Sequence, residues 1–299
     1  MGGRRPNAGA PPPQKIDFHL LYVVYSHHTP HTMSFTITNT ESAGKFVAMW
    51  KGISSLCDQI TVRFTPDGLM AQGMDSSHCS MFEFKVTPEW FATYAAPTES
   101  TVGLGMGIMT KIMAMRQPKQ GVCMRVAGDK FEIEYKSEEK DEVNRTFSVP
   151  TMDLDAEVME VPERESEVDL TLTSAKFAQI VSQMGVFGDV IDFRVGDDTM
   201  TMITEGDAGT MRVGLDDTDL EEFSVTEDVA LNQSFALRYL GMFSGFSKVN
   251  TFVRLSLTED MPVIVRFPLD ANVVTDPNMD SDNYIRLYLA PKIGDVGDE

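Results

Sequence analysis

The sequence predicts an α+β fold made of two tandem copies of one domain, each with two helices among many strands. Short alternating runs, typical of half-buried strands, are interrupted by a few amphipathic helices. One pattern of strand, helix and hairpin recurs about 131 residues further along the chain. The chain has 299 residues, of which 42% are apolar, and this is enough for about two domains with cores of their own.

The first copy begins with a strand, predicted from the alternation over Phe35–Thr38. Apolar residues then follow helical spacing over Ser42–Leu56, and alternation returns over Ile60–Phe64. The next four residues, Thr65–Gly68, read Thr-Pro-Asp-Gly and are typical of a turn, so a hairpin follows the helix. A second helix is predicted over Met106–Arg116.

The second copy repeats this order. The segment that starts at Thr173 aligns with the segment that starts at Glu41, and both contain a Lys-Phe pair. Its second helix is predicted over Ser234–Phe246, where Arg238 takes a place comparable to that of Lys111 in the first copy. The last strands are predicted over residues 263–267 and 284–289.

The copies are separated by a proline-bounded, carboxylate-rich segment, residues 151–166, which predicts an extended connector. The expected domains are residues 33–150 and 167–293, followed by an acidic tail over 294–299. Residues 1–32 are expected to be a flexible extension, because their apolar run contains Asp17 and His19 and fits neither a signal peptide nor a membrane span. We hypothesise that Met33 is the functional start.

Residue patterns for catalysis or metal binding are scarce. Only His78 of the five histidines lies in the body, and the three cysteines include no C-x-x-C pair. The Gly103-x-Gly105-x-Gly107 run lacks dinucleotide-binding spacing and predicts tight backbone geometry. The acidic run from Asp276 lacks the glycine and the final glutamate of a calcium-binding loop. We therefore expect no enzyme activity, no cofactor and no metal.

Charge is distributed unevenly along the chain. The net charge is −20, yet the predicted helices carry cations while strands and loops carry most of the acid. Solvated helix faces would explain this pattern, and so would a basic lining that attracts phosphate within a Debye length of about 10 Å. The helix cations are Lys45, Lys51, Lys111, Arg116, Lys176 and Arg238. The 20 methionines likewise fit either core filling or adaptable partner surfaces.

Four motifs, in order and at matching spacings, resemble the proliferating cell nuclear antigen family of eukaryotic-type sliding DNA clamps. They are Met74–His78, the connector pieces Met152–Asp155 and Val161–Glu163, the segment Phe235–Leu240, and Tyr288–Ile293. The resemblance spans about Ser34 to Ile293. It implies the DNA-clamp fold, in which three subunits of two similar domains form a closed ring with strands outside and helices around duplex DNA.

The resemblance also implies a pocket under the connector that receives partner peptides of the Q-x-x-hydrophobic-x-x-aromatic-aromatic type. The matching positions are Met74, His78, Cys79, Met81, Met159, Val161, Pro162, Pro262, Ala290, Pro291 and Ile293. It makes the six helix cations DNA-facing. The lining is expected to be less basic than usual, since relatives often have Lys or Arg at the positions of Ala48, Ala114, Gln179 and Ser182.

Subunits of the family meet through strand edges, here expected over Val143–Val149 and Gly209–Leu215. The expected interface residues are Val143, Phe147, Val149, Met211 and Val213. Asp197 stands where relatives carry the lysine that receives ubiquitin, which puts control by that modification in doubt.

The expected function is therefore that of a homotrimeric DNA polymerase processivity factor in replication and repair. Its expected partners are duplex DNA, a DNA polymerase, a clamp loader and other proteins with the peptide motif, and no membrane. The expected location is the nucleus, or a viral replication site if a virus encodes the protein. The alternative is a clamp-like scaffold or decoy that binds partner peptides without encircling DNA, which the thinned basic lining would allow.

Overall fold

The computed structural model describes residues 33–292, except 140–141, 155–158, 160–164, 197–198, 217, 228 and 271–278. The expected extension, the acidic tail and Asp197 lie outside the described residues. The described elements form two series with the same order, as the internal repeat predicts: strand, helix, five strands, helix and three strands.

The first series begins the chain's compact body and includes one short 3-10 helix, η1 (Pro88–Trp90). Its elements are β1 (Ser34–Ile37), α2 (Thr40–Ile53), β2 (Gln59–Thr65), β3 (Gly68–Met74), β4 (Ser80–Val86), β5 (Thr93–Ala95), β6 (Ser100–Gly105), α3 (Met106–Ala114), β7 (Gly121–Ala127), β8 (Lys130–Lys136) and β9 (Arg145–Pro150).

The second series follows the connector and includes the 3-10 helix η2 (Gly245–Lys248). Its elements are β10 (Val168–Thr173), α4 (Ser174–Met184), β11 (Val190–Gly196), β12 (Thr199–Gly206), β13 (Gly209–Leu215), β14 (Glu222–Val225), β15 (Leu231–Ala236), α5 (Leu237–Ser244), β16 (Phe252–Leu257), β17 (Val263–Pro268) and β18 (Tyr284–Leu289).

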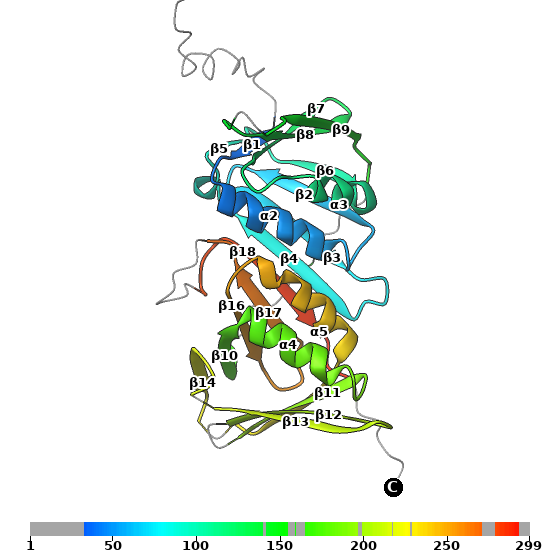
Figure 1. Cartoon of the computed structure of the whole chain (residues 1–299), viewed down its shortest axis with the longest axis vertical. Helices are drawn as coiled ribbons and strands as arrows, with labels where there is room; N and C mark the ends of the chain where they lie inside the picture. Colours follow the sequence, from blue (N-terminus) through cyan, green and yellow to red (C-terminus); the bar gives the residue numbers. More distant parts are fainter. Residues whose placement is uncertain are drawn as a thin grey trace, which may run out of the picture.

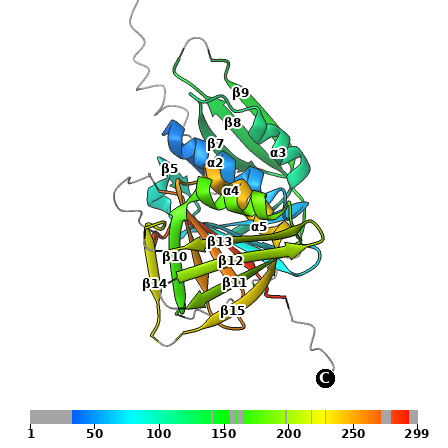
Figure 2. The same cartoon turned by 60° about the horizontal axis from the view of Figure 1, so that its bottom comes forward.

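The strands form three antiparallel sheets. Their orders are β5-β1-β7-β8-β9, β13-β12-β11-β15 and β14-β10-β16-β17-β18-β4-β3-β2-β6. The nine-stranded sheet joins the two domains, because β18 pairs with β4 and places Leu287 opposite Phe82. Figure 1 shows this junction near the middle of the long axis, with the helices gathered on one side of the sheet. Figure 2 shows the four-stranded sheet of the second domain next to α4 and α5.

A repeated hydrogen bond fixes the start of the second helix in each domain. The Met106 N–H donates to the Asp58 carbonyl over 2.8 Å, and the Leu237 N–H donates to the Asp189 carbonyl over 2.9 Å. The helix predicted from Ser234 therefore begins three residues later than expected. Residues 234–236 instead remain in β15, paired with β11.

This offset corrects one comparison between the domains. Lys111 is the sixth residue of α3, whereas Arg238 is only the second residue of α5. Because Met106 and Leu237 are the equivalent first residues, the two cations do not occupy comparable places. The sequence predicted equivalent places because each cation lies a similar number of residues after its predicted helix start, and the predicted start of the second helix was wrong.

The helices also join the two domains through one close contact. The Phe246 ring of η2 lies against Gly52 of α2 and stacks on Phe267 of β17, with ring centroids 6.1 Å apart. A Cβ at Gly52 would lie only 2.5 Å from the Phe246 ring. Glycine at this position therefore allows the two domains to pack closely.

Local sequence signals located the first hairpin correctly. Thr65 lies opposite Gly68, so Pro66 and Asp67 form the turn between β2 and β3. Gly68 has a φ of 133°, a backbone conformation that glycine adopts without steric cost. The helix after β1 begins at Thr40 because the Asn39 side chain accepts hydrogen bonds from the first turn.

Candidate functional site

Two described pieces of the connector contact the nine-stranded sheet, at Met152 and at Met159. Met152 forms an isolated bridge with Gly103 of β6, where a Cβ would lie 2.4 Å from the Met152 carbonyl oxygen. This contact confirms the predicted tight backbone geometry at Gly103, but the prediction is wrong for Gly107, where no atom lies within 4 Å of a Cβ. Further along, the Gln72 side chain donates to the Met159 carbonyl over 3.2 Å and accepts from the Met159 N–H over 3.1 Å.

Beside this connector contact, four apolar side chains form a row across four strands. Met74 lies opposite Met81, Met81 opposite Tyr288, and Tyr288 opposite Ile264. Met74 is 38% exposed, while Met81 and Tyr288 are buried. Residues alternate between the faces of a strand, so this row points away from the core residues Phe82 and Leu287. Sequence reasoning found the two methionines and missed Tyr288 and Ile264, which only the strand register brings beside them.

The turn between β3 and β4 is organised by the buried Asp75 carboxylate. It accepts hydrogen bonds from the N–H groups of Ser77 (2.9 Å), Cys79 (2.8 Å) and Ser80 (2.6 Å). The Tyr239 hydroxyl of α5 donates to the same carboxylate over 2.8 Å. Burial raises the pKa of Asp75, but these hydrogen bonds outweigh burial and lower the pKa to about 2. The turn of the first domain is thus fixed by a helix of the second.

Several predicted pocket residues meet around this turn. The Ala290 N–H donates to the Cys79 carbonyl over 3.0 Å, so the chain after β18 lies against the turn. His78 is exposed and has a φ of 57°. Pro262, just before β17, and Pro291, two residues after β18, are half-buried. The predicted pocket residues Val161, Pro162 and Ile293 lie outside the described residues.

Three of the six predicted DNA-facing cations are exposed on the helices: Lys51 of α2, Lys111 of α3 and Arg238 of α5. Arg238 donates to the Tyr239 hydroxyl over 2.9 Å and so contacts the tyrosine that binds Asp75. Sequence reasoning missed Lys248 of η2, which is also exposed on the helical side. Its short 3-10 helix carried no helical periodicity that could have marked it.

Lys45 is not a surface cation, contrary to prediction. Its side chain is buried, and its ammonium group donates to the Asp270 carbonyl over 2.5 Å. Glu41 lies one helical turn away, with its carboxylate 3.5 Å from the same ammonium. Burial lowers the pKa of Lys45, and Glu41 opposes this effect. The helix face that carries Lys45 therefore packs inward.

Arg116 and Lys176 are also engaged in contacts within the chain. The Arg116 guanidinium donates to the carbonyl oxygens of Gln120 (2.8 Å) and Thr40 (2.7 Å), which joins the end of α3 to the start of α2. Burial lowers the pKa of Arg116. Lys176 donates to the carbonyl and the carboxylate of Asp219, over 2.8 and 3.1 Å. The exposed cations on the helices are consequently fewer than sequence predicted.

The expected subunit edges are two strands at the ends of their sheets, β9 and β13. Phe147, Met211 and Val213 are partly buried on these strands, whereas Val149 lies in the core of its own domain. The predicted strand from Val143 instead begins at Arg145, and Val143 is exposed ahead of it. The strand is shorter because the Val143 carbonyl accepts a hydrogen bond from the Gln120 side chain (2.9 Å) rather than from a neighbouring strand.

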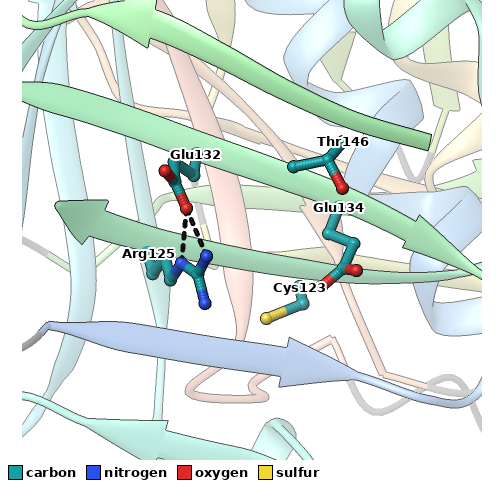
Figure 3. A pocket seen from close by; sticks show the side chains of 5 residues that line it. All are labelled: Cys123, Arg125, Glu132, Glu134 and Thr146. Atoms are coloured by element: carbon teal, nitrogen blue, oxygen red, sulfur yellow. Dashed lines mark hydrogen bonds and ion pairs between the residues drawn. The ribbon is translucent and has the colours of Figure 1, made fainter.

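A small hollow lies elsewhere, on the five-stranded sheet (Figure 3). Its volume is about 40 Å³, and it is lined by Cys123, Arg125, Glu132, Glu134 and Thr146. Arg125 donates to Glu132 over 2.6 Å, so both side chains are already paired. Across the described part of the chain, no group of three or more His, Cys, Asp or Glu side chains could hold a metal ion, and no helix there is long and apolar enough to cross a membrane.

Comparison with known proteins connects this architecture to one family. The model for the N-terminal domain of proliferating cell nuclear antigen matches residues 38–158, and the model for its C-terminal domain matches residues 160–291. The probable DNA polymerase sliding clamp 2 of Paramecium bursaria Chlorella virus 1 is 28% identical over 89% of this chain and 93% of its own length. The proliferating cell nuclear antigen of Chaetomium thermophilum is 26% identical over 76% of this chain and 86% of its own length.

Solved structures give the same fold. The crystal structure of the proliferating cell nuclear antigen of Entamoeba histolytica matches with a TM-score of 0.75 and 22% identity. The match covers 87% of this chain and 99% of the other. With both domain models matched and the duplicated architecture present, the chain belongs to the proliferating cell nuclear antigen family of sliding clamps and has the DNA-clamp fold.

Proposed function

We propose that this chain is a DNA polymerase processivity factor that closes into a ring of three copies around duplex DNA. The ring would hold the polymerase on its template by topological linkage, with only sequence-independent phosphate contacts inside. Family membership bears out the expectation that the chain is not an enzyme, and the relatives' names do not favour the scaffold or decoy alternative. The observation that carries the ring is the unequal use of strand edges in the two domains.

Most strands at the edge of a sheet have a counterpart in the other domain that also lies at an edge. β5 and its counterpart β14 both end a sheet, as do β6 and β15. In contrast, β18 and β4 pair with each other, whereas their counterparts β9 and β13 end their sheets without a partner strand among the described residues. β9 and β13 lie at opposite ends of the long axis (Figure 1), as head-to-tail assembly requires. Joining them would also remove two edges that invite aggregation.

The internal junction supplies the expected register of the subunit contact. We align Phe147 with Leu287, since each lies near the middle of its strand and opposite a core residue, Ile133 or Val265. Met211 corresponds to Phe82 by its place in the preceding hairpin. Since Leu287 lies opposite Phe82 inside the chain, we expect Phe147 to lie opposite Met211 across the interface, with Arg145 opposite Val213.

The helical side is the proposed DNA-facing side. Lys51, Lys111, Arg238 and Lys248 are exposed there and would contact phosphates. The connector side is the proposed partner-binding side, where Met74, Met81 and Met159 lie with Tyr288 around the anchored turn. A motif of the Q-x-x-hydrophobic-x-x-aromatic-aromatic type would place its apolar anchors there.

The proposed partners are duplex DNA, a DNA polymerase, a clamp loader and other proteins that carry the motif. Relatives include a viral and several eukaryotic proteins, so the proposed location is a replication site in the nucleus or one organised by a virus.

Mass in solution tests the ring. Light scattering during gel filtration should give about three times 33.2 kDa for the native chain over a range of concentrations. Phe147→Asp and Met211→Asp should each yield monomers, because each buries a charge at the proposed edge. Val186→Asp, at a site 71% exposed after α4, should leave the mass unchanged. A native chain that is monomeric at every concentration would refute the closed ring.

A further inference from the structure

A row of charged side chains crosses the outer face of the nine-stranded sheet, two residues along the strands from the apolar row. The strand register aligns Arg254, Arg266, Arg286, Glu83 and Gln72 on β16, β17, β18, β4 and β3. They point away from the helices, because their neighbours Val265 and Leu287 belong to the core. We call Arg254, Arg266 and Arg286 the arginine row. Beyond Arg286, the aligned residues continue through Glu83 to Gln72, which holds the connector at Met159.

The two outer arginines have carboxylate partners. Arg254 pairs with Glu222 over 2.7 Å and with Asp280 over 2.8 Å. The Arg286 guanidinium lies 4.0 Å from the Glu83 carboxylate. Each end of the row is thus at least partly neutralised.

Arg266, in the middle of the row, forms no ion pair with any residue that the structure describes. Its guanidinium donates to the Ser281 carbonyl, and its buried Nε has no hydrogen-bond acceptor among those residues. An unpaired guanidinium at a half-buried position is costly unless a negative group comes to it. Among the described residues, no carboxylate therefore pairs with the centre of the row.

The Tyr284 ring holds two of these cations in fixed positions. The guanidinium carbons of Arg266 and Arg286 lie 4.5 and 4.3 Å from the ring centroid, and the Tyr284 hydroxyl donates to Glu83 over 2.8 Å. Burial first, and then the charge of Arg286, lower the pKa of Arg266 to about 10. Arg266 thus remains charged at neutral pH. The Tyr284 ring holds the guanidinium groups of Arg266 and Arg286 on the outer face of the sheet, where their N–H groups could bind an anion.

We propose that the arginine row binds an acidic segment flanking the pocket-binding motif of a partner protein, an inference that rests on the partner pocket proposed above. Neighbouring strands are about 4.8 Å apart, so Arg266 lies about 14 Å from Gln72 and the connector. Four or five extended residues span that distance. Glu222, Asp280 and Glu83 balance the charge of the outer arginines, so the attraction comes from Arg266, which has no ion pair among the described residues. Its guanidinium would attract carboxylate or phosphate groups of a partner and so discriminate among partners by charge.

Two synthetic peptides test the proposal by fluorescence anisotropy with the full chain. Both carry the same Q-x-x-hydrophobic-x-x-aromatic-aromatic motif, and they differ only in whether the flanks on both sides contain glutamates or glutamines. We expect the acidic peptide to bind about 5- to 10-fold more tightly at low salt, and this advantage to shrink as salt rises. Arg266→Gln should abolish the advantage while leaving the affinity for the glutamine peptide within about twofold. Arg266→Lys should retain part of the advantage. Arg125→Gln should retain all of it, because Arg125 lies on the five-stranded sheet and is paired with Glu132.

The outcomes separate this inference from the proposed function. If the glutamine peptide binds and the glutamates give no advantage, the arginine row does not recognise acidic residues, and this inference alone is wrong. An equal loss of both peptides in Arg266→Gln would show a structural role and would also overturn it. If neither peptide binds the native chain, the partner pocket itself is wrong and the inference is overturned with it. Tighter binding of a DNA duplex than of the acidic peptide, lost in Arg266→Gln, would assign the row to nucleic acid instead.

Discussion

At the residue scale, Asp75 shows how one carboxylate connects the two domains. The carboxylate accepts hydrogen bonds from three N–H groups of its own turn and from the Tyr239 hydroxyl of α5. Because these bonds favour the ionised form, the folded-state pKa of about 2 lies below the ordinary value of 3.8. The stabilisation by Asp75 is therefore complete well above pH 4 and is lost as pH falls toward 2.

Asp75→Asn should lower the free energy of unfolding at pH 7 by about 1–3 kcal/mol. Both carboxylate oxygens of Asp75 accept hydrogen bonds, whereas the amide of Asn keeps one accepting oxygen and has an NH2 group that cannot accept from the other donors. Urea denaturation at one protein concentration, repeated at several pH values, measures the change. The difference between native chain and variant should shrink as pH falls from 5 to 2. A difference that stays constant over this range would contradict the role given to the charge.

Lys45 and Lys51 show what a sequence can and cannot predict about single residues. Both lie on a predicted amphipathic helix, and the family resemblance made both of them DNA-facing. Lys51 is exposed, but Lys45 points to the carbonyl of Asp270, a residue 225 positions away. Only the tertiary fold brings that acceptor close, so local periodicity had no means to distinguish the two lysines.

At the element scale, local signals located the α-helices and several strands, and the errors fall at the ends of elements. The turn at Pro66–Asp67 and the strand Tyr284–Leu289 were predicted from residue types alone. The start of α5 was wrong because residues 234–236 satisfy their backbone by pairing with β11, a contact that helical periodicity does not report. The apolar and arginine rows were likewise hidden, since they depend on the register between strands distant in sequence.

The contact between η2 and α2 gives a prediction for two glycines. Gly52→Ala should lower the free energy of unfolding by about 1–3 kcal/mol, because the new methyl group would overlap the Phe246 ring. Gly241→Ala in α5 is the matched control, since no atom lies within 4 Å of a Cβ there and alanine favours a helix. Urea denaturation should find the second variant as stable as the native chain or up to about 1 kcal/mol more stable. Equal effects of both substitutions would exclude the close contact as the cause.

At the scale of the whole molecule, the internal repeat explains both the fold and the proposed assembly. Family motifs in the sequence implied the ring, and the strand orders supply a physical reason for it. β18 pairs with β4 inside the chain, whereas their counterparts β9 and β13 are left at sheet edges, where they could pair between subunits. The exposed cations are fewer than the sequence predicted, because Lys45, Arg116 and Lys176 bind groups within the chain. A thin basic lining suits a clamp that is held by topology rather than by affinity.

Retention on circular DNA tests the central claim most directly. The chain is loaded by its clamp loader onto a nicked circular duplex, transferred to high salt and separated from free protein by gel filtration. A closed ring should remain on the circle at salt concentrations that abolish phosphate contacts, and should leave once a restriction enzyme linearises the DNA. Loss from the intact circle in high salt, or equal retention before and after linearisation, would contradict a clamp that encircles DNA.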